Sequence, residues 1–154
     1  ILRGETGVQK EEKFYFLLEQ LLRDYAEAAE TEPKAEKRVE IRNVCDYLSA
    51  NYAGTVSLDA LAKIACLSKY HLLRSFTKEM GITPYCYLET IRIDRAKELL
   101  KSGKSPAEVA QQTGFSDQSH FTNAFKHMIG LTPGQFRRVF GGEIEEQERE
   151  TEKA

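Results

Sequence analysis

The sequence predicts an all-α fold in which two helix-turn-helix units are joined by a long connecting helix. Apolar residues recur at steps of three and four, and no strand pattern appears from residue 39 onward. One order of residues, in which Ser is followed by His, Phe, Gly and Thr-Pro, occurs twice. It is found in CLSKYHLLRSFTKEMGITP, residues 66–84, and about 48 residues later in GFSDQSHFTNAFKHMIGLTP, residues 114–133. The stretch between the copies is typical of a single long helix.

Length and composition fit a small globular protein, either one ordinary domain or a small domain with an extension. The 154 residues are 41% hydrophobic, which is enough for a core. No apolar run approaches the roughly 18 residues of a membrane span, and no secretory signal is present. The chain begins at Ile1 rather than Met, as expected for a piece of a longer protein.

The cysteines indicate a reducing environment. Cys45, Cys66 and Cys86 are odd in number and form no CxxC pair, which argues against both a disulfide framework and a zinc site. Reduced thiols in a cytoplasmic protein are the simplest interpretation.

Charge is distributed unevenly along the chain. The net charge is -2, but residues 41–140 have 13 Lys and Arg against 8 Asp and Glu. Residues 1–40 have 7 against 10, and residues 141–154 have 2 against 6. A basic middle between acidic ends fits a polyanionic partner, and it fits an ordinary surface equally well.

The N-terminal part is expected to form a helix over residues 10–29, because apolar residues recur there at helical steps. This face could pack on its own chain, but we favour a dimerisation helix or the last helix of a preceding domain. We therefore assign residues 1–32 to a helical remnant. Residues 33–38 are mostly charged and begin with Pro33, so they predict a linker. The apolar face of the helix expected at 10–29 is made by Phe14, Leu17, Leu18, Leu21, Leu22 and Tyr25.

Two helices are expected before the first copy of the repeated pattern. A helix at 39–52 is closed by Gly54. Ser57 is a candidate N-cap of a short helix that follows. The apolar positions are Ile41, Val44, Cys45 and Leu48 in the first helix, and Leu58, Leu61, Ala62 and Ala65 in the second.

The first long helix of the pattern is expected at 68–80, capped by Ser68 and ended by Gly81 in a left-handed conformation. Thr83 is expected to cap the connecting helix, with Pro84 in its first turn. This helix should stop at the Ser-Gly pair 102–103. About 17 residues make it roughly 26 Å long.

The second copy repeats this scheme. A short helix, a long helix at 116–129, a stop at Gly130 and a last short helix through Phe140 are expected. The tail at 141–154 is acidic, has almost no apolar residue and is predicted to be disordered. The expected helix starts are Ser105 with Pro106, Ser116, and Thr132 with Pro133.

Each copy has a turn that fits helix-turn-helix geometry. A small residue, Ala62 or Ala110, lets the two helix backbones approach, and four residues later the turn needs an unusual backbone conformation. Gly114 supplies it in the second copy. Cys66 stands there in the first, at a cost of about 1 kcal/mol if its conformation is left-handed.

The second helix of each unit has an inward apolar face and an outward polar face. At 100° per residue, Leu72, Phe76 and Met80 point inward in the first, as do Phe121 and Phe125 in the second. The residues at the outward positions could be ordinary surface residues. However, Arg can bind guanine, Asn can bind adenine, and Leu or Thr can contact a thymine methyl group. The outward positions are Tyr70, Leu73, Arg74 and Thr77, and then Ser119, Thr122, Asn123 and Lys126.

Residues 39–140, and above all GFSDQSHFTNAFKHMIGLTPGQFRR, resemble the DNA-binding domain of the AraC/XylS family of bacterial transcription regulators. The resemblance implies two homeodomain-like three-helix units on a rigid connecting helix, with recognition helices at 68–80 and 116–129. It also implies phosphate contacts from Lys78, Lys126 and Arg137. Asn123 stands where many relatives have a basic residue. The DNA contacts implied by position and by face are Lys69, Tyr70, Leu73, Arg74 and Thr77, and Ser116, Gln118, Ser119, His120, Asn123 and Lys126.

The resemblance further implies how the chain works and with what partners. Double-stranded DNA would be read in two successive major-groove segments about one turn, or roughly 34 Å, apart. Family members commonly have an effector-binding domain ahead of the reader, and the resemblance implies that this domain is not part of the 154 residues. Residues 10–29 would then be a helix that mediates homodimerisation, and RNA polymerase is a further possible partner.

No enzyme signature is present, and we expect no catalytic residue, no cofactor and no metal site. Asp117, Ser119 and His120 are too close together on one helix to converge on a substrate. Phosphate loops and metalloprotease motifs are missing from the sequence. The alternative to DNA binding is a protein-interaction module that uses the apolar face at 14–25 and the acidic tail.

Overall fold

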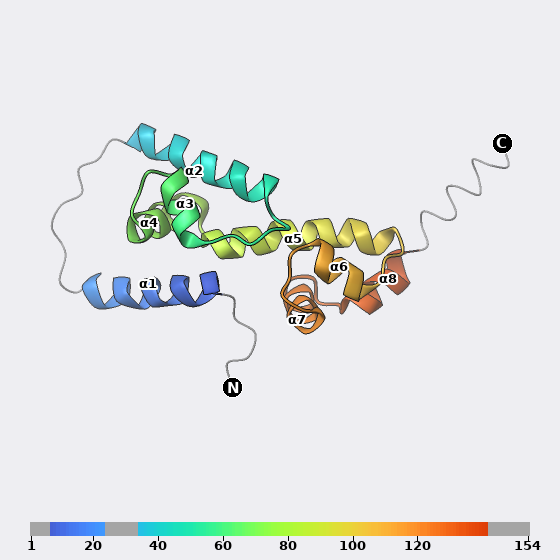
Figure 1. Ribbon diagram of the computed structural model, residues 1–154. Helices are drawn as coiled ribbons and strands as arrows, with labels where there is room; N and C mark the ends of the chain where they lie inside the picture. Colours follow the sequence, from blue (N-terminus) through green and yellow to red (C-terminus); the bar gives the residue numbers. More distant parts are fainter. Residues whose placement is uncertain (1–6, 24–33, 142–154) are drawn as a thin grey trace. The chain divides into compact units, whose positions relative to one another are not determined.

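The structure, a computed structural model, describes residues 7–23 and 34–141, which hold eight helices and no strand (Figure 1). The chain divides into two units, Ile1–Leu88 and Glu89–Ala154, so the boundary falls within one helix. No helix in the described ranges has the length and apolarity needed to cross a bilayer. The helices are α1 (Gly7–Arg23), α2 (Lys34–Ala50), α3 (Leu58–Ile64), α4 (Lys69–Met80), α5 (Pro84–Lys101), α6 (Pro106–Gln112), α7 (Gln118–Ile129) and α8 (Pro133–Phe140).

In the first unit, α2, α3 and α4 pack on one another, and α1 contacts α3 and α4. The expected caps are confirmed: the Ser57 hydroxyl accepts the Ala60 N–H at 3.1 Å, and the Ser68 hydroxyl accepts the His71 N–H at 3.2 Å. These caps fix where α3 and α4 begin, and therefore which residues face the core. The fully buried apolar side chains include Ile41, Val44, Leu48, Leu58, Leu61, Leu72 and Phe76.

In the second unit, the later part of α5 packs with α6, α7 and α8 around an aromatic core. The rings of Phe121 and Phe125 are 5.5 Å apart, and Phe125 and Phe136 are 5.3 Å apart, both near edge-to-face. This geometry suits the ring quadrupole and adds to the burial of apolar area. The core consists of Ile93, Ala96, Leu100, Val109, Ala110, Phe115, Phe121, Phe125 and Phe136.

The two helix-turn-helix turns have the same hydrogen bonds. The Leu67 N–H donates to the Ala62 carbonyl at 3.0 Å, and the Phe115 N–H donates to the Ala110 carbonyl at 3.0 Å. The expected conformation is also confirmed, since φ is +52° at Cys66 and +80° at Gly114. The sequence repeat is therefore a structural repeat.

The second copy differs from the first by one residue, which corrects the expected start of its long helix. The N-cap of α7 is Asp117, whose carboxylate accepts the His120 N–H at 2.7 Å, rather than Ser116. The turn residues Cys66 and Gly114 are 48 positions apart, but the left-handed glycines that end α4 and α7, Gly81 and Gly130, are 49 apart. Ser116 is thus an added residue in the turn.

Other boundaries also differ from expectation. α2 begins at Lys34, so residues 34–38 of the predicted linker are helical; Ala, Glu and Lys are strong helix formers, and their propensity prevails over the charge pattern. Met80, expected inside, is exposed because it is the last residue of α4. The predicted disordered tail, apart from Gly141, and much of the 1–32 remnant lie outside the described residues.

Candidate nucleic-acid interface

α4 and α7 present equivalent positions once the one-residue difference is taken into account. Leu72 and Phe76 are buried in the first unit, as Phe121 and Phe125 are in the second. The outward positions 49 residues apart are Arg74 in α4 and Asn123 in α7, and both are exposed. The two units therefore display corresponding residues on corresponding faces, and both residue types can form bidentate contacts with base edges.

The outward placement expected for Leu73 is wrong. Its side chain is only 7% exposed, and it belongs to the core of the first unit. Leu73 lies about 60° around the helix from Phe76, so it falls within the wide apolar stripe of a core-facing helix. Tyr70 and Thr77 are half-buried, as Lys69 is, so Arg74 is the exposed member of the predicted contacts on α4.

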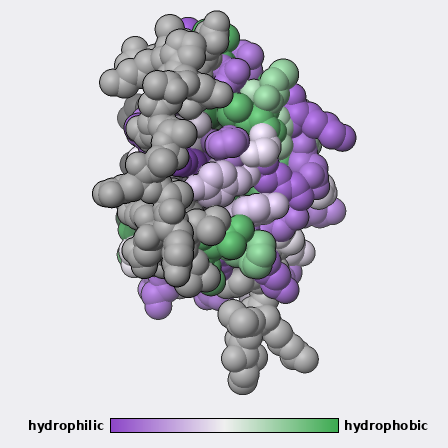
Figure 2. Space-filling view, turned by 90° about the vertical axis from the view of Figure 1, so that its left-hand side faces the viewer, coloured by the Kyte–Doolittle hydropathy of each residue, from purple (hydrophilic) through white to green (hydrophobic). Residues whose placement is uncertain are grey.

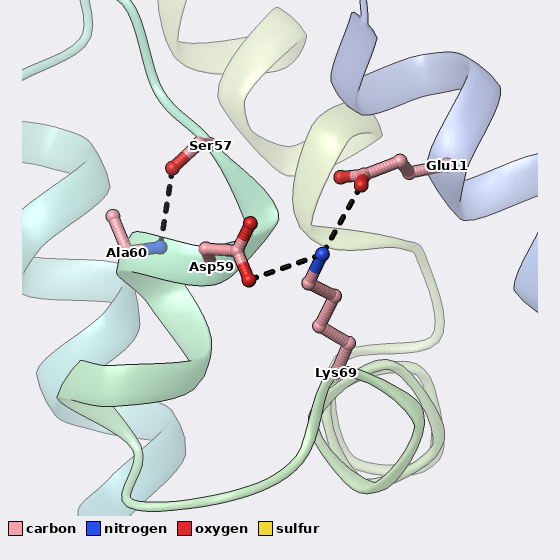
Figure 3. Close-up of polar contacts among 5 residues, drawn as sticks. All are labelled: Glu11, Ser57, Asp59, Ala60 and Lys69. Atoms are coloured by element: carbon pink, nitrogen blue, oxygen red, sulfur yellow. Dashed lines mark hydrogen bonds and ion pairs between the residues drawn. The ribbon is translucent and has the colours of Figure 1, made fainter.

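Lys69 is held by two carboxylates, one from α3 and one from α1. Its Nζ lies 3.0 Å from Oδ1 of Asp59 in α3 and 3.1 Å from Oε1 of Glu11 in α1 (Figure 3). The hydrogen bonds with Asp59 and with Glu11, in that order, raise the pKa of the ammonium above its ordinary value. Glu11 is distant in sequence from Lys69, so no local pattern could have revealed this contact.

The start of α7 presents several exposed polar side chains. Ser116, Gln118 and Ser119 are all exposed there, with Asn123 and Lys126 further along the helix. The Ser116 hydroxyl donates to Oδ2 of Asp117 at 3.2 Å and lies 3.2 Å from Nδ1 of His120. The His120 N–H bonded to Asp117 is the main reason that the pKa of this carboxyl is lowered.

His120 has contacts that hold its ring in place. Its side chain is 11% exposed, its ring lies edge-on to Phe115 at 5.2 Å, and Nε2 lies 3.7 Å from a Glu89 oxygen in α5. With Ser116 at Nδ1, both ring nitrogens have polar neighbours. The contact of His120 with DNA stays a prediction, and its contact with Glu89 is one that sequence reasoning missed.

The residues proposed for phosphate contact lie near helix ends. Lys78 and Lys126 are exposed in the last turns of α4 and α7. Arg137 is exposed in α8, and its Nη1 donates to the Lys104 carbonyl at 3.5 Å. Among the described residues, no group of three or more His, Cys, Asp or Glu side chains is placed to hold a metal ion.

Comparison with known proteins finds similarity to helix-turn-helix transcriptional regulators. A family model described as a helix-turn-helix domain matches residues 61–139. The chain is 49% identical over 144 residues to the HTH-type transcriptional regulator YbfI of Bacillus subtilis (strain 168). That alignment covers 94% of this chain and 52% of that protein. It is 36% identical over 125 residues to the arabinose operon regulatory protein of Escherichia coli (strain K12), covering 79% of this chain and 42% of that protein. The chain thus spans about half the length of these relatives.

Two solved structures are similar over most of the described residues. The C-terminal domain of AraT, a response regulator from Geobacillus stearothermophilus, has a TM-score of 0.62 at 30% identity, with 65% of this chain and 84% of that chain covered. The DNA-binding domain of AdpA, a global transcriptional factor solved in complex with a target DNA, has a TM-score of 0.62 at 24% identity. That similarity covers 66% of this chain and 92% of the other, and it shows a shared fold.

Proposed function

Because this chain belongs to the AraC family of helix-turn-helix transcriptional regulators, we propose that it binds specific double-stranded DNA through α4 and α7. The observation that carries the proposal is the repeated exposure of Arg74 and Asn123 at equivalent positions of two matched units. Each residue type has donors in a geometry that matches a base edge in the major groove. Ser116, Gln118 and Ser119 extend this surface at the start of α7.

The connecting helix supports reading by both units on one DNA molecule. α5 has 18 residues, which corresponds to roughly 27 Å of helix. It contributes Leu88 to the first unit and Ile93, Ala96 and Leu100 to the second. We propose that the two recognition helices enter successive major-groove segments about one turn, or roughly 34 Å, apart. A single chain would then need no palindromic site.

A binding-site selection on random duplexes, followed by footprinting, tests this function. Two protected patches about one helical turn apart are expected. Arg74→Ala and Asn123→Ala should each weaken binding to the selected duplex by about 1–3 kcal/mol and relax the base preference in separate half-sites. Lys126→Ala should weaken all sequences alike and reduce the salt dependence, since its predicted partner is a phosphate.

Arg42→Ala is a matched control for Arg74→Ala, because it removes the same charge from an exposed position of α2. It should leave the base preference unchanged. If Arg74→Ala and Asn123→Ala bind the selected duplex as tightly as the unaltered chain does, the assignment of base contacts to these residues is wrong.

We further propose that the chain forms a homodimer through residues 10–29. The described part of this segment, in α1, has three large apolar side chains that are each more than half exposed: Phe14, Phe16 and Leu17. Figure 2 shows that apolar residues also lie exposed among hydrophilic ones on one face of the protein. A second copy of the same helix offers a self-complementary apolar partner.

The remaining parts of the proposal follow from family membership. We infer that the protein is a cytoplasmic, non-enzymatic regulator that associates with the nucleoid when bound to DNA. Contact with RNA polymerase belongs to the same proposal, and the exposed face of α1 is the described surface best suited to a protein partner.

A further inference from the structure

Two neighbouring acids of α1 reach across to the first helix-turn-helix unit. Glu12 is only 5% exposed, and its carboxylate accepts the Thr83 hydroxyl at 2.7 Å and the Tyr85 N–H at 2.7 Å. Thr83 and Tyr85 form the start of α5, where the N–H groups of the first turn have no partner within the helix. A carboxylate is favoured at this end of a helix by the helix dipole. Glu12 therefore anchors α1 to the unit.

The anchored helix brings the adjacent Glu11 to Lys69, the first residue of α4. Glu11 is 3.1 Å from the Lys69 ammonium, which also contacts Asp59 at 3.0 Å (Figure 3). Asp59 belongs to the same helix-turn-helix unit, whereas Glu11 comes from a helix that precedes it in the chain. The side chain of Lys69 is only 24% exposed in this arrangement.

We propose that α1 is an acidic latch on the first recognition helix: Glu12 docks it, and Glu11 occupies Lys69 in place of a DNA phosphate. The inference rests on the proposed DNA-binding function and adds a means of regulating it. The ammonium is already shared by two carboxylates, and a phosphate that approached it would meet the like charge of Glu11. Movement of α1 away from this site raises the affinity for DNA.

The latch acts mainly through the sequence-independent part of binding. Each phosphate that a Lys neutralises adds about 0.9 to the slope of log affinity against log salt concentration. Releasing Lys69 should therefore steepen the salt dependence of the affinity by about 0.9 in this slope, while leaving the base preference unchanged. A merely structural role of Glu11 predicts no such steepening.

The test compares the duplex affinity of Glu11→Gln, Glu12→Gln and the unaltered chain over a range of salt concentrations. Glu11→Gln should bind about two- to fivefold tighter at low salt, as expected for loss of one partly exposed ion pair, with a steeper slope. Glu12→Gln should also bind tighter, and it should speed amide hydrogen exchange in α1, because losing the negative charge weakens the hydrogen bonds of the anchor. Glu11→Gln should leave that exchange nearly unchanged.

Two controls separate the latch from a general effect of charge. Glu98→Gln removes one negative charge from an exposed position of α5, where Glu98 pairs with Lys101 at 3.6 Å, and should not change the salt slope. In a Lys69→Ala background, the gain from Glu11→Gln should vanish, because the two residues act through one contact.

Three results would overturn the latch: no gain from Glu11→Gln, an equal gain from Glu98→Gln, or a gain that persists without Lys69. If the unaltered chain and all variants bind selected and random duplexes alike, it is the proposed sequence-specific function that fails. If the unaltered chain binds specifically but Glu11→Gln gains nothing, only the latch fails.

Discussion

Replacing Cys66 by Gly should stabilise the protein, although it removes a side chain. Cys66 has φ of +52° and is the one non-glycine residue with positive φ among the described residues. A left-handed conformation costs a residue with a Cβ roughly 1–2 kcal/mol. The equivalent position in the second unit is Gly114, with φ of +80°, so the protein itself shows the residue that this turn favours.

The expected gain in the free energy of unfolding is the backbone strain that glycine relieves, minus the entropic cost of folding a chain that is more flexible when unfolded. Glycine costs roughly 0.5–1 kcal/mol through that entropy, which leaves a net gain of about 0–1.5 kcal/mol, centred near 0.75 kcal/mol. The thiol contributes little that offsets this gain, because it is exposed and its Sγ is 3.8 Å from the Lys63 carbonyl. For a chain of this size, the gain corresponds to a rise of about 1–4 °C in Tm.

Thermal unfolding of three variants measures the effect. Cys66→Gly should raise the free energy of unfolding, and Gly114→Ala should lower it by roughly 1–2 kcal/mol. Cys66→Ala is the control, since it removes the sulfur but keeps the Cβ and should therefore give no gain. If Cys66→Ala stabilises as much as Cys66→Gly, or if Cys66→Gly is destabilising, backbone strain is not the reason.

Two further predictions concern a core residue and the dimer. Leu73→Ala should lower the free energy of unfolding by about 2–4 kcal/mol in urea titrations, because Leu73 is 7% exposed; unchanged stability with weakened DNA binding would instead favour a base contact. Phe14→Glu with Leu17→Glu should convert a dimer to a monomer in sedimentation equilibrium. The matched change Val139→Glu, on an exposed face of α8, should not, and a dimer that survives the paired change would contradict the proposed interface.

Local signals in the sequence predicted most of the fold. Ser57, Ser105 and Thr132 cap α3, α6 and α8 as expected, since each side chain accepts an N–H three residues later. The left-handed glycines 81 and 130 end α4 and α7 for an equally local reason. The start of α7 lies one residue later than expected: Ser116 and Asp117 are both good cap residues, and the structure has Asp117 as the cap, with Phe121 buried in the core.

The sequence predicts the candidate interface less completely than the fold. A helical wheel gives the direction of each side chain around the helix axis, but not how deeply the fold buries it. Arg74 and Asn123 are exposed as expected. Leu73 is buried instead, since its place at the flank of the apolar stripe becomes interior only when the neighbouring helices are in position. The helical wheel places His120 at the flank of the outward face, and only the structure shows that its ring lies against Phe115 and beside Glu89.

The sequence by itself determined the all-α architecture, the duplicated turn and the position of Cys66 in it, because caps, turn residues and apolar periodicity act over a few neighbouring positions. Only the tertiary structure decided that Glu12 binds the start of α5 and that Glu11 shares Lys69 with Asp59. These contacts join residues that are distant along the chain, and a charged residue in a sequence does not reveal which opposite charge folding will place beside it.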